Sequence, residues 1–369
     1  MSGTKKKVVK KVIKKKSSVK ITGPMKVTHA LHIDRDLNWS FDKNVDPNTI
    51  FQQIKEIGKG GFGTVIELMH IPSSTLLAGK SINPEIVNNN TKTMELLKRE
   101  IDLMRQIVSD YTIHYYGTII FKGNLTILME FCNLGSIRDL IDYRNKVLSE
   151  AQISIVMSDL LHALSILHDK YKIVHRDIKA ANILLSSSGY CRVTDFGVSR
   201  QFSSKTIDTS TMIGTPYWMA PEVINEEKYS YEADVWSAGA TAIECAIGAP
   251  PYVELPSTRA MIEIATNGFN GHFPFQERFS QEFVDFVFQC AEVNPKNRAT
   301  VNELLDHPFI KQAESLDRMQ IMAPLLSTQV DFAKLLEMSN EATEDEFETK
   351  TQSFINKSKS VIRTKHQDK

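Results

Sequence analysis

The chain has 369 residues, 42% hydrophobic and 24% charged, which is typical of a globular protein of about two domains. Its 44 basic and 44 acidic residues cancel, but residues 1–26 hold ten lysines and no acid. The four cysteines form no CxxC pair, which argues against a zinc site or a disulfide framework. Because no apolar run reaches the ~18 residues of a membrane span and no signal-peptide core is present, we expect a soluble, cytoplasmic protein.

The first segment, residues 1–45, is predicted to be a basic and disordered arm. Val8, Val9, Val12 and Ile13 would share one face if residues 1–20 became helical. Such a basic helix binds an anionic membrane or nucleic acid, or serves as a nuclear-import signal. A solvated tail explains the same composition equally well.

Residues 46–311 are predicted to form one domain with two lobes. Short strand-like runs lie within 54–71, 76–82, 112–121 and 124–131, and they surround one amphipathic helix at 94–107. Beyond Gly135, long helical periodicities dominate. A strand-rich segment followed by a helix-rich one predicts an α+β fold with a cleft between the lobes.

The tail, residues 312–369, is predicted to be partly helical or disordered. It contains two weak helical stretches, one at 317–338 and one at 345–362, with acidic residues clustered around their junction.

The strand-rich segment contains a glycine motif, with Gly58, Gly60 and Gly63 in the order G-x-G-x-x-G. A dinucleotide-binding turn has the same spacing but opens a helix, whereas here a β-type run follows. The glycines therefore lie at a hairpin, where backbone N–H groups can close over phosphate oxygens. Phe62 at its tip could shield the phosphates from solvent.

Lys80 is a cation within an apolar strand, and Glu100 lies on the apolar face of the following helix. An edge-strand lysine pointing to water is the commoner case. A buried carboxylate needs a cation, however, so we expect Lys80 and Glu100 to pair.

Two further oxygen-bearing side chains suit magnesium. Asp195 follows a short strand, and Asn182 lies in the polar run that begins at His175. Magnesium takes hard oxygen ligands and usually keeps few protein ones beside substrate phosphates. A lone Asp at a strand end would otherwise be a turn residue.

Together these motifs resemble the eukaryotic protein kinases over about residues 51–310. The matching positions are Gly58-x-Gly60-x-x-Gly63-x-Val65, Lys80, Glu100, His175-Arg176-Asp177, Asn182, Asp195-Phe196-Gly197 and Ala220-Pro221-Glu222. The resemblance implies ATP and Mg²⁺ (or Mn²⁺) as cofactors, with Asn182 and Asp195 as metal ligands. It implies an ATP site formed by Ile57, Gly58, Gly60, Gly61, Phe62, Gly63, Val65, Ala78, Lys80, Glu100, Met129, Glu130, Cys132 and Leu184.

The subclass follows from two residues. Lys179, two positions after the expected catalytic Asp177, is typical of serine/threonine kinases. Thr215 resembles the family's threonine whose hydroxyl joins the residues at the positions of Asp177 and Lys179. The chain is also similar to the germinal-centre kinase group, in particular its Hippo-like branch. The resemblance implies transfer of the ATP γ-phosphate to Ser/Thr hydroxyls of protein substrates in a signalling cascade. It gives structural roles to Arg176, Glu222, Asp234 and Arg298.

Arg176 indicates regulation by phosphorylation, because an arginine there needs an anion that a phosphorylated activation segment supplies. Thr211 matches the family's usual site, and Thr209 and Ser210 are the neighbouring candidates. The phosphate would come from an upstream kinase or from a second copy of the chain.

Two alternatives remain. A pseudokinase scaffold usually lacks the strand lysine, the catalytic aspartate or the metal-binding aspartate, whereas Lys80, Asp177 and Asp195 are all present. If the basic arm were instead the functional core, binding would be strongly salt-dependent and would need residues 1–20.

Overall fold

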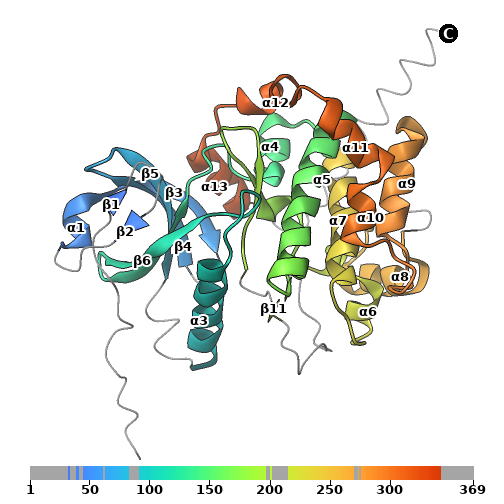
Figure 1. The fold of residues 1–369 in the computed structure, drawn as a ribbon, viewed down its shortest axis with the longest axis horizontal. Coiled ribbons are helices and arrows are strands. Elements are labelled where there is room, and N and C mark those ends of the chain that lie inside the picture. Colours follow the sequence, from blue (N-terminus) through green and yellow to red (C-terminus); the bar gives the residue numbers. More distant parts are fainter. Residues whose placement is uncertain are drawn as a thin grey trace, which may run out of the picture.

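The computed structural model describes residues 32–33, 39–40, 45–60, 63–82, 91–196, 200–201, 215–269, 273 and 276–341. The predicted basic arm lies almost entirely outside these residues, as do the hairpin tip at 61–62 and the activation-segment positions Thr209, Ser210 and Thr211. The predicted two-lobe α+β fold is confirmed: a small sheet-based lobe sits beside a larger helical lobe (Figure 1).

The small lobe is built on an antiparallel five-stranded sheet in the order β3-β4-β5-β7-β6. The alternating apolar residues of these strands bury one side against the lobe's interior, where Leu68, Leu77 and Ile119 are fully or almost fully buried. The strands are β3 (Phe51–Gly60), β4 (Gly63–His70), β5 (Thr75–Ile82), β6 (Tyr115–Phe121) and β7 (Asn124–Glu130), preceded by α1 (Pro47–Ile50) and by the pair β1 (His32–Ile33) and β2 (Trp39–Ser40).

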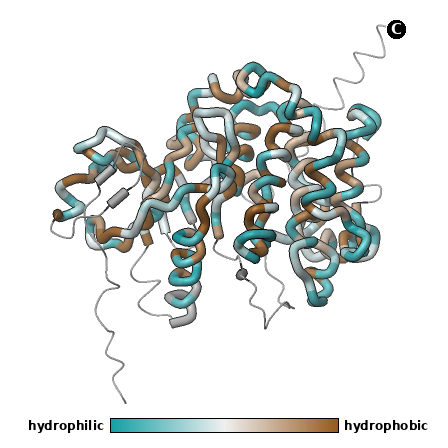
Figure 2. Tube along the Cα trace, in the orientation of Figure 1, coloured by the Kyte–Doolittle hydropathy of each residue, from teal (hydrophilic) through white to brown (hydrophobic). Residues whose placement is uncertain are grey.

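Helix α3 (Thr91–Gln106) packs beside this sheet (Figure 1). Leu97, Ile101 and Met104 are buried, whereas Lys98 and Arg99 are exposed. Figure 2 shows the resulting mixture of hydrophilic and hydrophobic positions along the helix. The helical period places Glu100 on the buried face, where it can meet the sheet.

The larger lobe is organised around two buried helices, α5 (Glu150–Ser165) and α7 (Glu232–Ile247). The segment Glu150–Lys170 would be long and apolar enough to cross a membrane, but 78% of its most apolar window is buried inside the fold. The other helices are α4 (Ile137–Arg144), α6 (Pro221–Ile224), α8 (Ser257–Asn267), α9 (Gln281–Cys290), α10 (Val301–Leu305) and α11 (Pro308–Ser315).

The remaining strands and helical turns are short. Strands β9 (Ile183–Leu185) and β10 (Cys191–Val193) pair antiparallel, as do β8 (Ile173–Val174) and β11 (Arg200–Gln201). The remaining turns of helix are the π-helical η1 (Ile166–Lys170) and the 3₁₀ turns η2 (Ala180–Asn182), η3 (Pro216–Trp218) and η4 (Gln276–Arg278).

The predicted helical stretch at 317–338 is divided into two helices in the structure. The helices are α12 (Arg318–Leu326) and α13 (Phe332–Glu341). The break has a local cause, because the Asp331 carboxylate accepts hydrogen bonds from the backbone N–H groups of Ala333 and Lys334 and so starts a new helix. The other predicted stretch, 345–362, lies outside the described residues.

Candidate active site

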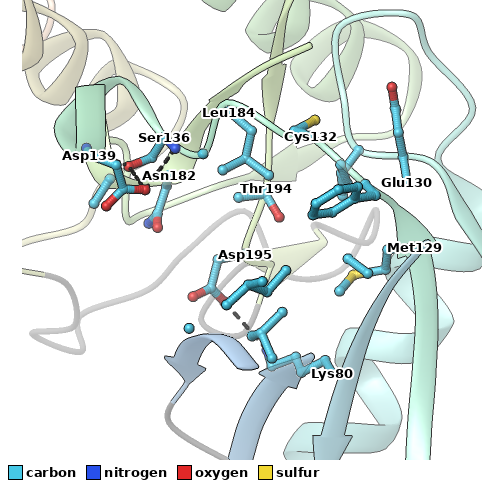
Figure 3. Close-up of a pocket in the computed structure, with 18 of the residues that line it drawn as sticks. Lys80, Met129, Glu130, Cys132, Ser136, Asp139, Asn182, Leu184, Thr194 and Asp195 are labelled. Atoms are coloured by element: carbon cyan, nitrogen blue, oxygen red, sulfur yellow. Dashed lines mark hydrogen bonds and ion pairs between the residues drawn. The ribbon is translucent and has the colours of Figure 1, made fainter. Parts of the chain in front are cut away.

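A buried ion pair connects the sheet to helix α3. Lys80 on β5 donates a 2.6 Å hydrogen bond to Glu100 Oε1, and both side chains are at least nine-tenths buried. Lys80 Nζ also lies 3.9 Å from Asp195 Oδ1 (Figure 3). Burial disfavours the Lys80 charge, but the carboxylates of Glu100 and Asp195 outweigh it and raise the lysine pKa. Lys80 is therefore held as a cation at the bottom of the cleft.

Asp177, Lys179 and Thr215 form a closed triangle of hydrogen bonds. Lys179 Nζ lies 2.9 Å from Asp177 Oδ2 and donates a 2.7 Å bond to Thr215 Oγ1. The Thr215 hydroxyl in turn donates to Asp177 Oδ1 at 2.8 Å. Burial by itself would raise the pKa of Asp177, but Lys179 and Thr215 lower it overall. Asp177 is thus an ionised, oriented carboxylate.

Asn182 is oriented by the same aspartate. Its amide nitrogen donates to the backbone oxygen of Asp177 at 2.7 Å and to the Asp177 carboxylate at 2.9 Å. With the nitrogen engaged, the amide oxygen of Asn182 remains as the acceptor on the side chain that lines the cavity with Asp195. Asp195, two residues after the end of β10, has a left-handed backbone with φ of +64°. These two oxygen-bearing groups fit a magnesium ion that shares its remaining ligands with phosphates.

Asp234, at the start of α7, holds the catalytic loop, residues 175–182, which runs from the end of β8 through η2. Its carboxylate accepts the backbone N–H groups of His175 and Arg176, each at 2.8 Å, and lies 2.8 Å from His168 Nε2. Arg176 has a left-handed φ of +72°, and Asp234 fixes this unusual backbone by bonding its N–H. The side chain of His175 is fully buried and packs edge-on against Phe196, with ring centroids 5.2 Å apart.

A second buried ion pair braces the larger lobe. The Arg298 guanidinium donates to both oxygens of Glu222, at 2.7 and 2.9 Å, and to the carbonyl of Glu232. This two-pronged geometry is the strongest arrangement for a side-chain ion pair. It ties Glu222 on α6 to the segment between α9 and α10, which is a structural role.

A cavity of about 380 Å³ lies between the lobes. Figure 3 shows Lys80 and Asp195 on one side and Met129, Cys132 and Leu184 on another. Glu130 bonds through its side chain to His114 (2.7 Å) and Arg192 (3.3 Å). The predicted ATP-site and metal-site residues that line the cavity are Ile57, Gly58, Val65, Ala78, Lys80, Glu100, Met129, Glu130, Cys132, Asn182, Leu184 and Asp195.

The other residues predicted for the ATP site belong to the glycine motif. Gly60 pairs with Gly63 across the hairpin. A side chain at Gly63 would place its Cβ 1.9 Å from the Ser81 carbonyl oxygen, so only glycine fits there. Gly61 and Phe62 lie outside the described residues.

Several lining residues were missed by the sequence reasoning. Ser136 and Asp139 form a reciprocal capping box at the start of α4, a pattern that S-x-x-D could have revealed. Phe332, Leu335 and Leu336 of α13 also line the cavity, and no local pattern distinguishes them from any amphipathic helix. The others are Lys59, Met104, Ile113, Phe131, Gly135, Ala181 and Thr194.

Comparison with known proteins agrees with this geometry. Residues 51–310 match the family model described as the protein kinase domain. The chain is 42% identical over 279 residues to serine/threonine-protein kinase cst-1 of Caenorhabditis elegans, covering 76% of this chain and 54% of that protein. It is 41% identical over 280 residues to serine/threonine-protein kinase hippo of Drosophila melanogaster, covering 76% and 40%.

The chain thus spans about half the length of these curated relatives, or less. The matched region contains both lobes, the Lys80–Glu100 pair and the Asp177 triangle. Because residues 51–310 match the protein kinase domain, the chain belongs to the protein kinase family.

Proposed function

We propose that the chain is an ATP-dependent serine/threonine protein kinase that acts on protein substrates in a signalling cascade. The observation that carries the proposal is the hydrogen-bonded triangle of Asp177, Lys179 and Thr215. It lies beside a cavity whose lining includes the Lys80–Glu100 ion pair. The similarity to two proteins named as serine/threonine kinases supports the same substrate class.

Each residue has a role that follows from its position. Asp177 orients the substrate hydroxyl and accepts its proton, because it is ionised and held by two donors. Lys179 neutralises charge on the transferred phosphoryl group, and Lys80 neutralises charge on the phosphates nearer the base. Because phosphoryl transfer has a loose transition state, positioning and charge stabilisation supply most of the catalysis.

Asn182 and Asp195 are the proposed magnesium ligands. When bound, the metal neutralises phosphate charge and helps to fix the phosphate geometry. The residues of this chain contribute the two oxygens and, through the bonds from Asn182 to Asp177, connect the metal position to the substrate position.

Arg176 is proposed to receive a regulatory phosphate from Thr211, Thr209 or Ser210. Its guanidinium lies 5.5 Å from the ring centroid of Tyr229 and lines a small recess with Met219 and Ala220. A phosphorylated threonine from the activation segment would add a charge-assisted bond there. An upstream kinase or a second copy of the chain is the proposed donor. The proposed location is cytoplasmic, with the basic arm as a further contact for membrane or nucleic acid.

The full chain with Asp177→Asn tests the proposal. The amide is nearly isosteric but cannot accept a proton, so we expect kcat for peptide phosphorylation to fall about 10³-fold while nucleotide binding is retained. Transfer of labelled γ-phosphate to serine-, threonine- and tyrosine-containing peptides measures both rate and specificity.

Asp110→Asn, at an exposed position that does not line the cavity, is the matched control and should keep its activity. Wild-type activity in Asp177→Asn would refute the catalytic assignment. A wild type that binds nucleotide without any transfer would favour the scaffold alternative.

A further inference from the structure

The C-terminal helix α13 reaches the cavity between the lobes. Phe332, Leu335 and Leu336 are part of the cavity lining together with residues of β3, β5, β7 and the catalytic loop. Figure 1 places α13 between the sheet of the small lobe and helix α4. The tail therefore supplies part of the lining of a cavity that is otherwise formed by the kinase domain.

Contacts to both lobes hold α13 in place. The Phe332 ring is 5% exposed and lies 6.3 Å from the Phe131 ring in the segment that connects the lobes. On the small-lobe side, Lys55 Nζ lies 5.2 Å from the Phe332 ring centroid. On the large-lobe side, Lys334 Nζ lies 5.4 Å from the Tyr143 ring centroid on α4. Cation–ring contacts of this length are attractive.

The preceding helix, α12, anchors the tail to the larger lobe. Arg318 donates to both oxygens of Asp159 on α5, at 2.7 and 2.9 Å, and stacks 4.2 Å from the Tyr190 ring centroid. Met322 and Leu325 are fully buried. Only residues 327–331 separate this anchor from α13, so the anchor restricts where α13 can lie.

The cavity remains open with α13 in this position. Its volume of about 380 Å³ lies within the range of small-molecule sites. Lys80, Asn182 and Asp195 still line it and supply the charged and polar groups that phosphates require. The three tail side chains are apolar, and Phe332 lies beside Phe131, so they suit the flat apolar base of a nucleotide.

We propose that α13 is a wall of the nucleotide site, and that Phe332, Leu335 and Leu336 contact the purine base and increase the affinity for nucleoside triphosphate. The proposal rests on the proposed function, because it needs a nucleotide in this cavity. It assigns the tail a positive role in binding. A tail that occluded the site would have the opposite effect on affinity.

Calorimetric titration of the full chain with the magnesium complex of a non-hydrolysable ATP analogue tests the proposal. Phe332→Ala and Leu336→Ala should each weaken binding about tenfold, the effect expected when a ligand loses a few tens of Å² of apolar contact. The KM for ATP should rise by a similar factor, while the KM for the peptide substrate should stay unchanged. Glu337→Ala, an exposed position on the same helix, is the control and should bind as the wild type does.

Each outcome decides one point. Unchanged affinity in both variants would overturn the proposal, and tighter binding would show that α13 occludes the site. Leu336→Ala removes a half-buried side chain and keeps Phe332, so it tests the wall even if Phe332→Ala releases the whole helix. A wild type that binds no analogue would instead refute the proposed function.

Discussion

Gly79, the residue before Lys80 on β5, is buried where the sheet is tightly packed. A Cβ built on it would lie 2.6 Å from Leu68 Cδ1, closer than real Cβ contacts, and 3.0 Å from Thr126 Cγ2, which is tighter than most of them. Leu68 is fully buried and cannot move away without cost. We expect Gly79→Ala to destabilise the small lobe by about 1–3 kcal/mol, the usual cost of overpacking. Thermal unfolding followed by calorimetry measures the loss.

Gly58→Ala is the matched control on the neighbouring part of the sheet. Its Cβ would meet Val65 at 3.7 Å, an ordinary contact, so its transition temperature should stay close to that of the wild type. Equal transition temperatures for Gly79→Ala and wild type would mean that Leu68 adapts, and that the glycine is not required by packing.

Among the helices, α12 is tied to the larger lobe by Arg318 as well as by its buried apolar side chains. Asp159, the partner of Arg318, is 1% exposed, and it also accepts the backbone N–H of Cys191 at 2.9 Å. Burial raises the pKa of Asp159, and Arg318 opposes that rise. Arg318→Met keeps the apolar stem but removes two hydrogen bonds from a buried carboxylate. We expect a loss of about 2–3 kcal/mol, near the low end for a broken buried pair.

Chemical unfolding of the larger lobe measures this loss, and Lys311→Met provides the control. Lys311 is half-exposed and pairs with Asp306 and Glu314 at the surface, where ion pairs contribute little. If Arg318→Met unfolded at the same denaturant concentration as Lys311→Met, the anchor would carry no stability.

The same elements show what the sequence could and could not predict. Lys80 and Glu100 were recognisable because each is a charged residue in an apolar setting, and the glycine motif was recognisable by its spacing. The tail gave no such signal. The sequence around Phe332 has the pattern of any amphipathic helix. The ring that Phe332 contacts, Phe131, lies about 200 residues earlier in the chain. Contacts between distant segments depend on the completed fold, so the wall that α13 adds to the cavity became visible only in three dimensions.

At the scale of the whole molecule, Asp234 couples the core of the larger lobe to the catalytic loop. It is fully buried on α7 and accepts the N–H groups of His175 and Arg176. Burial would raise its pKa, but the hydrogen bond and charge of His168 lower it overall, with help from His175 and the Arg176 N–H. Loss of this carboxylate would therefore affect stability and the catalytic loop together.

Because the pKa of Asp234 is lowered in the folded protein, the stability that this carboxylate contributes should fall at acidic pH. A carboxyl whose folded pKa lies below its unfolded value of about 3.9 contributes stability at higher pH, and that stability is lost as the pH falls through the folded pKa. Asp234→Asn should therefore lose about 3 kcal/mol at pH 7, and the difference from wild type should shrink below about pH 4. Unfolding of both proteins from pH 7 to pH 3.5 measures the difference, with Asp110→Asn as an exposed control. A difference that stayed constant or grew on acidification would show that the ionised carboxylate is not what stabilises the loop.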